Sequence, residues 1–217
     1  MKFKGKEIKA CIFDLDGTLL DSCSIWKEVD ERFFEKRGMQ VPSDYSKEIG
    51  PLGLDKASEY TIKRFNLKEK KEDIINEWLS DVIRCYEEEV ELKPYAKEFL
   101  DFLKKNNIPM FVATANSREC YEPALKRNGI YEYFDYIENT SSYPKGKKDP
   151  AIYLDLSERC GIDPKNIIVF EDIVIGLENA AKAGFITCAI YEKTSQEEDK
   201  KKDIADFYCI DYLELLR

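Results

Sequence analysis

The stretch IKACIFDLDGTLLDS at residues 8–22 decides the expected fold. Its first seven residues form a short apolar run that ends in a carboxylate, Asp14, and such a run predicts a buried strand ending there. Asp16 follows two positions later, and Gly17 lets the backbone turn tightly after it. Because ligands bind beyond the carboxyl ends of strands in open parallel sheets, these two carboxylates are candidates for a catalytic pair. Taken without the rest of the stretch, they would read as a turn with capping aspartates.

Further apolar runs predict strands at residues 109–114, 166–170, 185–190 and 205–209. Amphipathic stretches between them predict helices at residues 95–105, 117–128, 149–160 and 173–183. The last three stretches are followed by Gly129, Gly161 and Gly184, and a glycine in this place is a common helix stop. This alternation of strand and helix predicts a parallel sheet with helices on both faces.

Residues 22–91 interrupt that alternation and contain no convincing strand. Helices with charged outer faces are expected at residues 25–37, 54–65 and 71–88. The predicted fold is therefore α/β, with a Rossmann-like parallel sheet as its core and an all-helical cap inserted into it. Residues 1–21 and 92–217 would form the core, and residues 22–91 the cap. The polar segment 196–203 is expected to be a solvated loop or helix end.

The composition restricts the function. The 217 residues carry a net charge of −9, which argues against nucleic acid or an anionic membrane as a partner. The chain has no histidine, so histidine-based catalysis and histidine-ligated metal sites are excluded. A metal would be held by carboxylates, which favours a hard ion such as Mg²⁺. Seven scattered cysteines without a CxxC pair, and no apparent signal peptide or membrane span, indicate a cytoplasmic protein.

Four segments together resemble the motifs of the haloacid dehalogenase superfamily of phosphatases and phosphomutases. FDLDGTLLDS at 13–22 is similar to the first motif, and ATANS at 113–117 resembles the second. KKDP at 147–150, followed by Ala-Ile-Tyr, resembles the third, in which Lys148 replaces a usual proline. FEDIVIG at 170–176 resembles the fourth, in which Ile173 replaces a usual serine. The motifs occur in family order across nearly the whole core, and the helical insertion lies where the subgroup with a four-helix cap has it.

The resemblance implies roles for the residues of the first two motifs. Asp14 would attack phosphorus and form a covalent intermediate, and Asp16 would be the general acid and base. The Thr114 hydroxyl and the backbone N–H groups of Ala115 and Asn116, at a helix N-terminus, would bind the transferring phosphoryl group. Thr114 could equally be a helix N-cap, and in this fold one residue could serve both purposes.

The third and fourth motifs supply charge. Lys147 would pair with Asp14 and the phosphoryl oxygens, although the lysines of this loop alone would read as a solvated charge run. Glu171 and Asp172 end a predicted buried strand, where two adjacent carboxylates need a cation. Replacement of serine by Ile173 removes a hydrogen bond near the metal site. The implied Mg²⁺ ligands are Asp14, Asp16 through its backbone carbonyl, Asp172 and, through water, Glu171.

The expected function is Mg²⁺-dependent hydrolysis of a small phosphate monoester, such as a sugar phosphate, through an aspartyl-phosphate on Asp14. A sugar phosphomutase is the alternative, but related mutases carry a histidine at the position of Trp26. Dehalogenases need neither Asp16 nor the acidic pair, and a non-catalytic protein would be expected to have lost Asp14 or Asp16. The expected partner is a small phosphorylated metabolite and the expected state a monomer. Cap candidates for substrate contact are Trp26, Tyr45 and the turn at 50–53.

Overall fold

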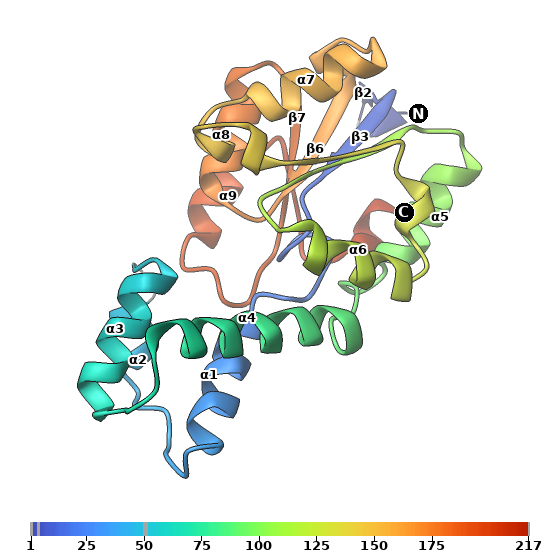
Figure 1. Ribbon diagram of the computed structural model, residues 1–217. Helices are drawn as coiled ribbons and strands as arrows, with labels where there is room; N and C mark the ends of the chain where they lie inside the picture. Colours follow the sequence, from blue (N-terminus) through green and yellow to red (C-terminus); the bar gives the residue numbers. More distant parts are fainter. Residues whose placement is uncertain (1, 4, 50–51, 217) are drawn as a thin grey trace. The chain divides into compact units, whose positions relative to one another are not determined.

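The computed structural model describes residues 2–3, 5–49 and 52–216 (Figure 1). The chain divides into two compact units. Residues 1–23 and 90–217 form an α/β unit, and residues 24–89 form a helical unit. The helical unit is inserted after the first strand of the sheet, near the segment 22–91 for which a cap is predicted.

The centre of the α/β unit is a six-stranded parallel sheet with the order β5-β4-β3-β6-β7-β8. Phe13 is paired with Val112 of β4 on one side and with Phe170 of β6 on the other, so β3 is central. This arrangement confirms the predicted α/β fold class. The strands are β3 (Ala10–Phe13), β4 (Met110–Thr114), β5 (Tyr136–Asn139), β6 (Ile167–Glu171), β7 (Ile186–Ile190) and β8 (Phe207–Cys209).

Helices connect the strands of this sheet. They are α5 (Ala96–Lys105), α6 (Arg118–Arg127), α7 (Ala151–Cys160), α8 (Val174–Lys182) and α9 (Glu198–Ile204). Short 3₁₀ turns complete the connections: η1 (Tyr131–Tyr133), η2 (Thr140–Ser142), η3 (Gly146–Lys148), η4 (Pro164–Asn166) and η5 (Tyr212–Leu215). A separate antiparallel pair joins β1 (Lys2–Phe3) to β2 (Lys6–Glu7).

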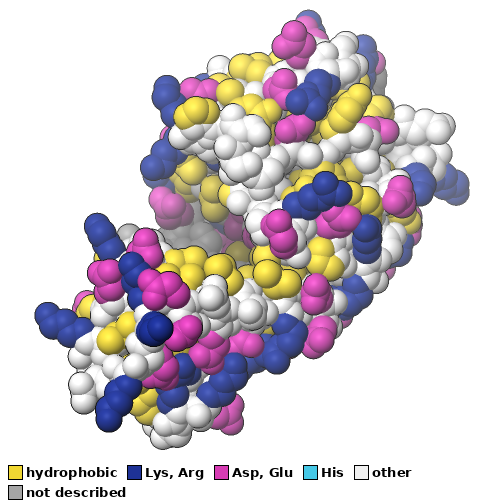
Figure 2. All heavy atoms as spheres, in the orientation of Figure 1, with side chains coloured by type: hydrophobic (Ala, Val, Ile, Leu, Met, Phe, Trp, Pro, Cys, Tyr) yellow, Lys and Arg dark blue, Asp and Glu magenta, His cyan; other side chains and the backbone are white. Residues whose placement is uncertain are grey.

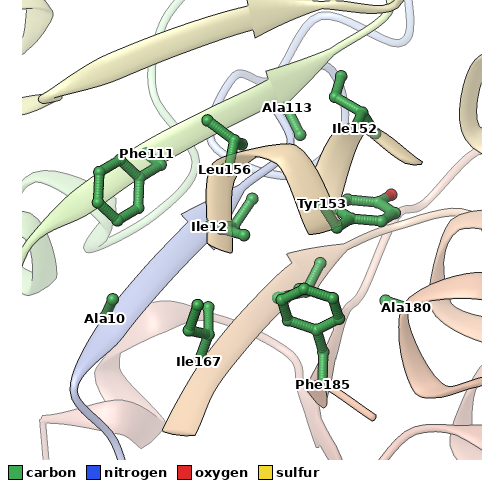
Figure 3. Close-up of a cluster of buried hydrophobic side chains, with 11 residues drawn as sticks. Ala10, Ile12, Phe111, Ala113, Ile152, Tyr153, Leu156, Ile167, Ala180 and Phe185 are labelled. Atoms are coloured by element: carbon green, nitrogen blue, oxygen red, sulfur yellow. The ribbon is translucent and has the colours of Figure 1, made fainter. Parts of the chain in front are cut away.

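Alternate residues of the strands pack on opposite faces of the sheet, as strand geometry requires. On one face Ile12 belongs to a buried cluster with Tyr153 and Leu156 of α7 and Ala180 of α8 (Figure 3). On the other face Phe13 stacks on Phe170 at 4.6 Å, and its ring meets Phe99 of α5 edge to face at 6.3 Å. Because both faces are covered, the central strands β3, β4 and β6 are largely apolar, and their polar groups lie at their ends.

The helical unit consists of α1 (Ile25–Glu35), α2 (Tyr45–Ile49), α3 (Leu54–Phe65) and α4 (Lys71–Glu88). Its core is aromatic. Phe34 is fully buried, with ring centroids 5.5 Å from Phe33, 4.9 Å from Tyr45 and 4.8 Å from Phe65. Trp78 of α4 lies 5.4 Å from Phe33 and links α4 to α1.

Several elements differ from the expectations of the sequence, among them β5, α2 and α9. The short edge strand β5 and the helix α2 are not predicted, because each has too few residues to show a hydrophobic period. Residues 198–204 form α9, a full helix that is mostly exposed except at Lys201. Lys201 of this helix is fully buried. Its ion pair with Glu198 compensates the buried charge, and its Nζ also donates a hydrogen bond to the Ile190 carbonyl at 3.0 Å.

Acidic and basic side chains are interspersed on the visible surface of each unit (Figure 2). Many of them form pairs, such as Arg64 with Asp44 at 2.8 Å in the helical unit and Arg159 with Glu138 at 2.6 Å in the α/β unit. Within the described ranges of the chain, no helix has both the length and the apolar character needed to cross a membrane.

Candidate active site

Asp14 immediately follows β3, at the edge of the sheet where the parallel strands end. Its backbone N–H donates to the Phe170 carbonyl of β6 at 3.0 Å, so its main chain is fixed by the neighbouring strand. The carboxylate is buried, with 6% of the residue exposed. Burying a carboxylate costs desolvation energy, and the apolar strand offers no charge to offset it. Asp14 therefore needs charged partners.

Lys147 supplies that partner from η3. Its Nζ contacts Asp14 Oδ1 and lies 2.5 Å from Glu171 Oε1. Burial opposes its charge, but Asp14 and Glu171 outweigh this effect and raise the pKa of Lys147, so it is a permanent cation. The neighbouring Lys145 and Lys148 are exposed. Asn179 of α8 donates to the Lys147 carbonyl at 2.9 Å and fixes the loop in which a lysine replaces the usual proline.

Three carboxylates meet beside Lys147. Oxygens of Asp14, Glu171 and Asp172 lie within 4.8 Å of one another, and all three residues are buried. The pKa of Asp172 is raised, because it is desolvated and repelled by Asp14 and Glu171, and the pKa of Glu171 is raised mainly by its own burial. One ammonium cannot balance three carboxylates. This cluster therefore fits a divalent cation bound by oxygen ligands.

Two further features of the cluster bear on whether it can bind a divalent cation. Glu171 Oε2 is buried and has no hydrogen-bond partner among the described residues, so an acceptor remains for water or a cation. The Thr18 hydroxyl lies 3.4 Å from Asp14 Oδ2 and 3.3 Å from Asp172 Oδ1, and it can donate to only one at a time. Asp14 and Asp172 are thus held close together without being neutralised.

Two glycines of the motifs make room for these carboxylates. A Cβ at Gly17, whose φ is +76°, would lie 2.3 Å from Asp172 Oδ2. A Cβ at Gly176, inside α8, would lie 2.6 Å from Glu171 Oε1. A side chain at either position would displace an acid of the cluster, so these glycines are explained by close approach and not by the turn alone.

Asp16 has different surroundings from Asp14. Its Oδ1 accepts hydrogen bonds from Ser22 Oγ at 2.6 Å and from Asn116 Nδ2 at 3.2 Å. Thr114 ends β4 and is fully buried, and its hydroxyl accepts the Asn116 backbone N–H at 3.0 Å. Thr114 therefore accepts a hydrogen bond in the turn after β4 but is not a helix N-cap, because the N-cap of α6 is Ser117. The first and second motifs meet through the Asp16–Asn116 contact.

The expected phosphate-binding amides lie before α6 and not at its first turn, because α6 begins at Arg118. Ala115 is exposed at this edge, while the Asn116 N–H already donates to Thr114. Phosphate binding by these groups stays a prediction, as do the catalytic roles of Asp14, Asp16, Thr114 and Lys147. The same holds for the metal-ligand roles of Asp14, Asp16, Glu171 and Asp172.

Sequence reasoning missed several residues of the site. Tyr153 donates its hydroxyl to Glu171 Oε1 at 2.8 Å, and Asn179 fixes the lysine loop. Thr18, Ser22 and Tyr153 lie within or beside the quoted motifs, and this position in the sequence could have marked them as site residues. Nothing in the sequence singles out Asn179.

The residues that were candidates for substrate contact from the helical unit differ in their exposure. Tyr45 was expected to face substrate, and this is wrong: it is fully buried in the helical unit and its hydroxyl bonds to Thr61 at 2.7 Å. Trp26 is 50% exposed. Ile173, in the α/β unit, is at the N-cap of α8, makes no side-chain capping bond and is 42% exposed. Of the turn at residues 50–53, Gly50 and Pro51 lie outside the described residues.

Comparison with known proteins agrees with this geometry. The family model for haloacid dehalogenase-like hydrolases matches residues 8–184. A phosphorylated carbohydrates phosphatase of Thermotoga maritima is 30% identical over 178 residues, which cover 82% of either chain. Hexitol phosphatase B of Escherichia coli is 24% identical, covering 93% of this chain and 91% of the relative.

Solved structures give the same picture. A Thermotoga maritima protein assigned as a beta-phosphoglucomutase superposes with a TM-score of 0.83 at 25% identity, over 93% of this chain and 94% of that one. A predicted phosphoglycolate phosphatase from Haemophilus somnus shares the fold, with a TM-score of 0.78 at 20% identity over 96% of each chain. With a family model that spans most of the chain and a buried acid cluster at the strand ends, the protein belongs to the haloacid dehalogenase-like hydrolases and is an enzyme of that family.

Proposed function

We propose that this enzyme is a Mg²⁺-dependent phosphatase that hydrolyses a small phosphate monoester, such as a sugar phosphate, through an aspartyl-phosphate on Asp14. The observation that carries the proposal is the buried Asp14 carboxylate between Lys147 and Asp172. The substrate class is supported by relatives named as phosphatases of phosphorylated carbohydrates and of hexitols.

In the first step Asp14 attacks phosphorus while the bond from phosphorus to the substrate oxygen breaks. Lys147 remains protonated throughout and offsets the negative charge that develops on the phosphoryl oxygens. Asp16 gives its proton to the departing alkoxide, so a neutral alcohol leaves. Covalent attachment divides one difficult displacement into two easier ones.

In the second step water attacks the phosphorus of the aspartyl-phosphate. Asp16, now a carboxylate, takes a proton from that water, and the bond between phosphorus and Asp14 breaks to release inorganic phosphate. Asp14 is regenerated as a carboxylate beside Lys147. The protons balance, because the one that Asp16 loses in the first step is recovered in the second.

The proposed Mg²⁺ ligands are Asp14, Asp172, the Asp16 carbonyl and, through water, Glu171. A divalent cation bound there supplies positive charge to a phosphoryl oxygen and relieves repulsion among the carboxylates. Tyr153 and Lys147 occupy Glu171 Oε1, which supports the indirect role of Glu171. Gly17 and Gly176 leave the space that Asp172 and Glu171 occupy.

We also propose that residues 24–89 are a cap that contacts the substrate. The two segments that join this unit to the α/β unit are paired: the Asp21 N–H donates to Glu91 O at 3.0 Å, and the Lys93 N–H to Leu19 O at 2.8 Å. Such a paired connection is suited to a hinge, because both segments that link the two units lie at the same place.

A sugar phosphomutase is the second candidate, favoured by the superposition with the Thermotoga maritima protein assigned to that activity. Transfer to a second sugar hydroxyl needs a group that activates that hydroxyl. The chain contains no histidine, and Trp26 occupies the position where related mutases carry one. Hydrolysis is therefore the preferred function.

The test is release of inorganic phosphate from a panel of sugar phosphates, other phosphate monoesters and nucleotides, with Mg²⁺ and with chelator. Asp14→Asn should lower turnover by on the order of 10⁴-fold or more, because an amide is not a usable nucleophile. Full activity of Asp14→Asn would contradict the covalent mechanism. Interconversion of hexose phosphates with little free phosphate would indicate the mutase instead.

A further inference from the structure

The side chain of Asn116 has no part in the proposed mechanism, yet it contacts one of its central groups. Asn116 follows β4 and Asp16 follows β3, and these are neighbouring parallel strands. Asn116 Nδ2 donates to Asp16 Oδ1 at 3.2 Å, and Ser22 Oγ donates to the same oxygen at 2.6 Å. Two donors on one oxygen restrict rotation of the carboxyl group.

Asn116 is itself fixed through its main chain. Its N–H donates to Thr114 Oγ1 at 3.0 Å, and its carbonyl accepts a hydrogen bond from Asn139 Nδ2 at the end of β5. Asn139 is held in turn, because its Oδ1 accepts the Ser141 N–H at 2.6 Å. A side chain whose backbone is tied to two strands can hold a partner in a narrow range of positions.

We propose that Asn116 is a positioning residue that holds Asp16 for proton transfer, an inference that rests on the proposed function. The two hydrogen bonds to Asp16 Oδ1 limit rotation of the carboxyl group, so Asp16 meets the leaving alkoxide and later the attacking water in one orientation.

If Asn116 positions Asp16, the effect of removing Asn116 should depend on the leaving group of the substrate. A sugar alkoxide is a poor leaving group and needs the Asp16 proton, whereas 4-nitrophenolate leaves readily without one. The ratio kcat/KM reports the steps up to formation of the phosphoenzyme, so it isolates the step in which Asp16 acts as an acid. A residue that binds the phosphoryl group would affect both substrates equally.

The experiment compares kcat/KM for a sugar phosphate and for 4-nitrophenyl phosphate in Asn116→Ala and Asn116→Asp. We expect Asn116→Ala to lose on the order of 30-fold with the sugar phosphate and less than about threefold with the aryl ester. Asn116→Asp keeps the size of the side chain but removes the donor, so it should lose at least as much with the sugar phosphate. Asn106→Ala, at the exposed end of α5, is the control and should match the parent enzyme.

Equal losses with both substrates, or no loss with either, would overturn the positioning role. Asp16→Asn and Asp14→Asn separate this failure from failure of the proposed function. If Asp16→Asn shows the leaving-group selectivity and Asn116→Ala does not, only the positioning role is wrong. If Asp14→Asn stays active, or Asp16→Asn shows no selectivity, the proposed mechanism is wrong whatever Asn116 does.

Discussion

The α/β unit and the helical unit both bury aromatic rings, but they differ in how they arrange buried charges. At the strand ends of the α/β unit, Asp14, Lys147, Glu171 and Asp172 are all at most 7% exposed. The core of the helical unit is aromatic, and its ion pairs lie nearer the surface, as between Lys36 and Glu77 at 3.0 Å. Buried charges cost desolvation energy that aromatic packing does not.

The comparison indicates what each unit is built for. A carboxylate cluster with one ammonium is a poor way to stabilise a fold, so its retention in the α/β unit indicates a chemical purpose. The helical unit obtains its stability from contacts among large rings, each of which contributes about 1.5–3 kcal/mol on burial. Substitutions in the two units should therefore differ in whether they change catalysis or stability alone.

The largest effect is expected from Lys147→Met. Loss of the ammonium leaves three buried carboxylates without their cation, so kcat/KM should fall on the order of 10³-fold. The free energy of unfolding should fall by about 3 kcal/mol, because one partner of a buried pair is removed. Circular dichroism during urea unfolding measures the stability, and phosphate release measures the activity. Lys148→Met, at the exposed neighbouring position, is the control, and equal behaviour of the two variants would contradict the role of Lys147.

Phe34→Ala should act on the helical unit through packing alone. Removal of this fully buried ring is expected to cost about 3–5 kcal/mol. Both tryptophans of the chain, Trp26 and Trp78, lie in the helical unit, so their fluorescence reports its unfolding in urea. Phe102→Ala removes a 38% exposed ring from the α/β unit and should leave that transition unchanged. A shift of equal size in both variants would show that the two units do not unfold separately.

The smallest effect is expected from Asp30→Asn, which should raise the free energy of unfolding where the two substitutions above lower it. Burial raises the pKa of Asp30 to about 6, an effect that the Ser46 hydroxyl at 3.3 Å lowers and the charge of Glu31 increases. A folded-state pKa above the unfolded value means that ionisation weakens the fold. The penalty is absent below about pH 4, grows as the pH rises towards 6 and is complete above that value.

Asp30→Asn should therefore stabilise the protein by about 1 kcal/mol at pH 8 and by nothing at pH 3.5, after allowance for solvent screening. Urea unfolding at a series of pH values, followed by tryptophan fluorescence, measures the difference. Glu35→Gln, at an exposed position of the same helix, should keep the pH dependence of the parent protein. A destabilised Asp30→Asn at pH 8 would mean that the ionised carboxylate has a favourable partner.

Sequence periodicity was sufficient for most of the architecture. The strands β3, β4, β6 and β7 are fully buried, so their apolar runs are continuous and easy to recognise. Long helices such as α3 and α4 show a clear apolar face. The edge strand β5 is half-exposed and brief, and Lys201 needs the Ile190 carbonyl of β7 as well as its neighbour Glu198, so local sequence alone predicts neither feature.

The sequence by itself determined the fold class, the family resemblance and the chemical types at the site, because these depend on residue identity and spacing along the chain. Only the tertiary structure decided that Lys147 bridges Asp14 and Glu171, why Gly17 and Gly176 cannot bear a side chain, and that Tyr45 packs inside the helical unit. It alone joined Asn116 to Asp16 across 100 residues. The contacts at the site arise where separate strands end side by side, and the order of residues along the chain does not give the distance between strand ends.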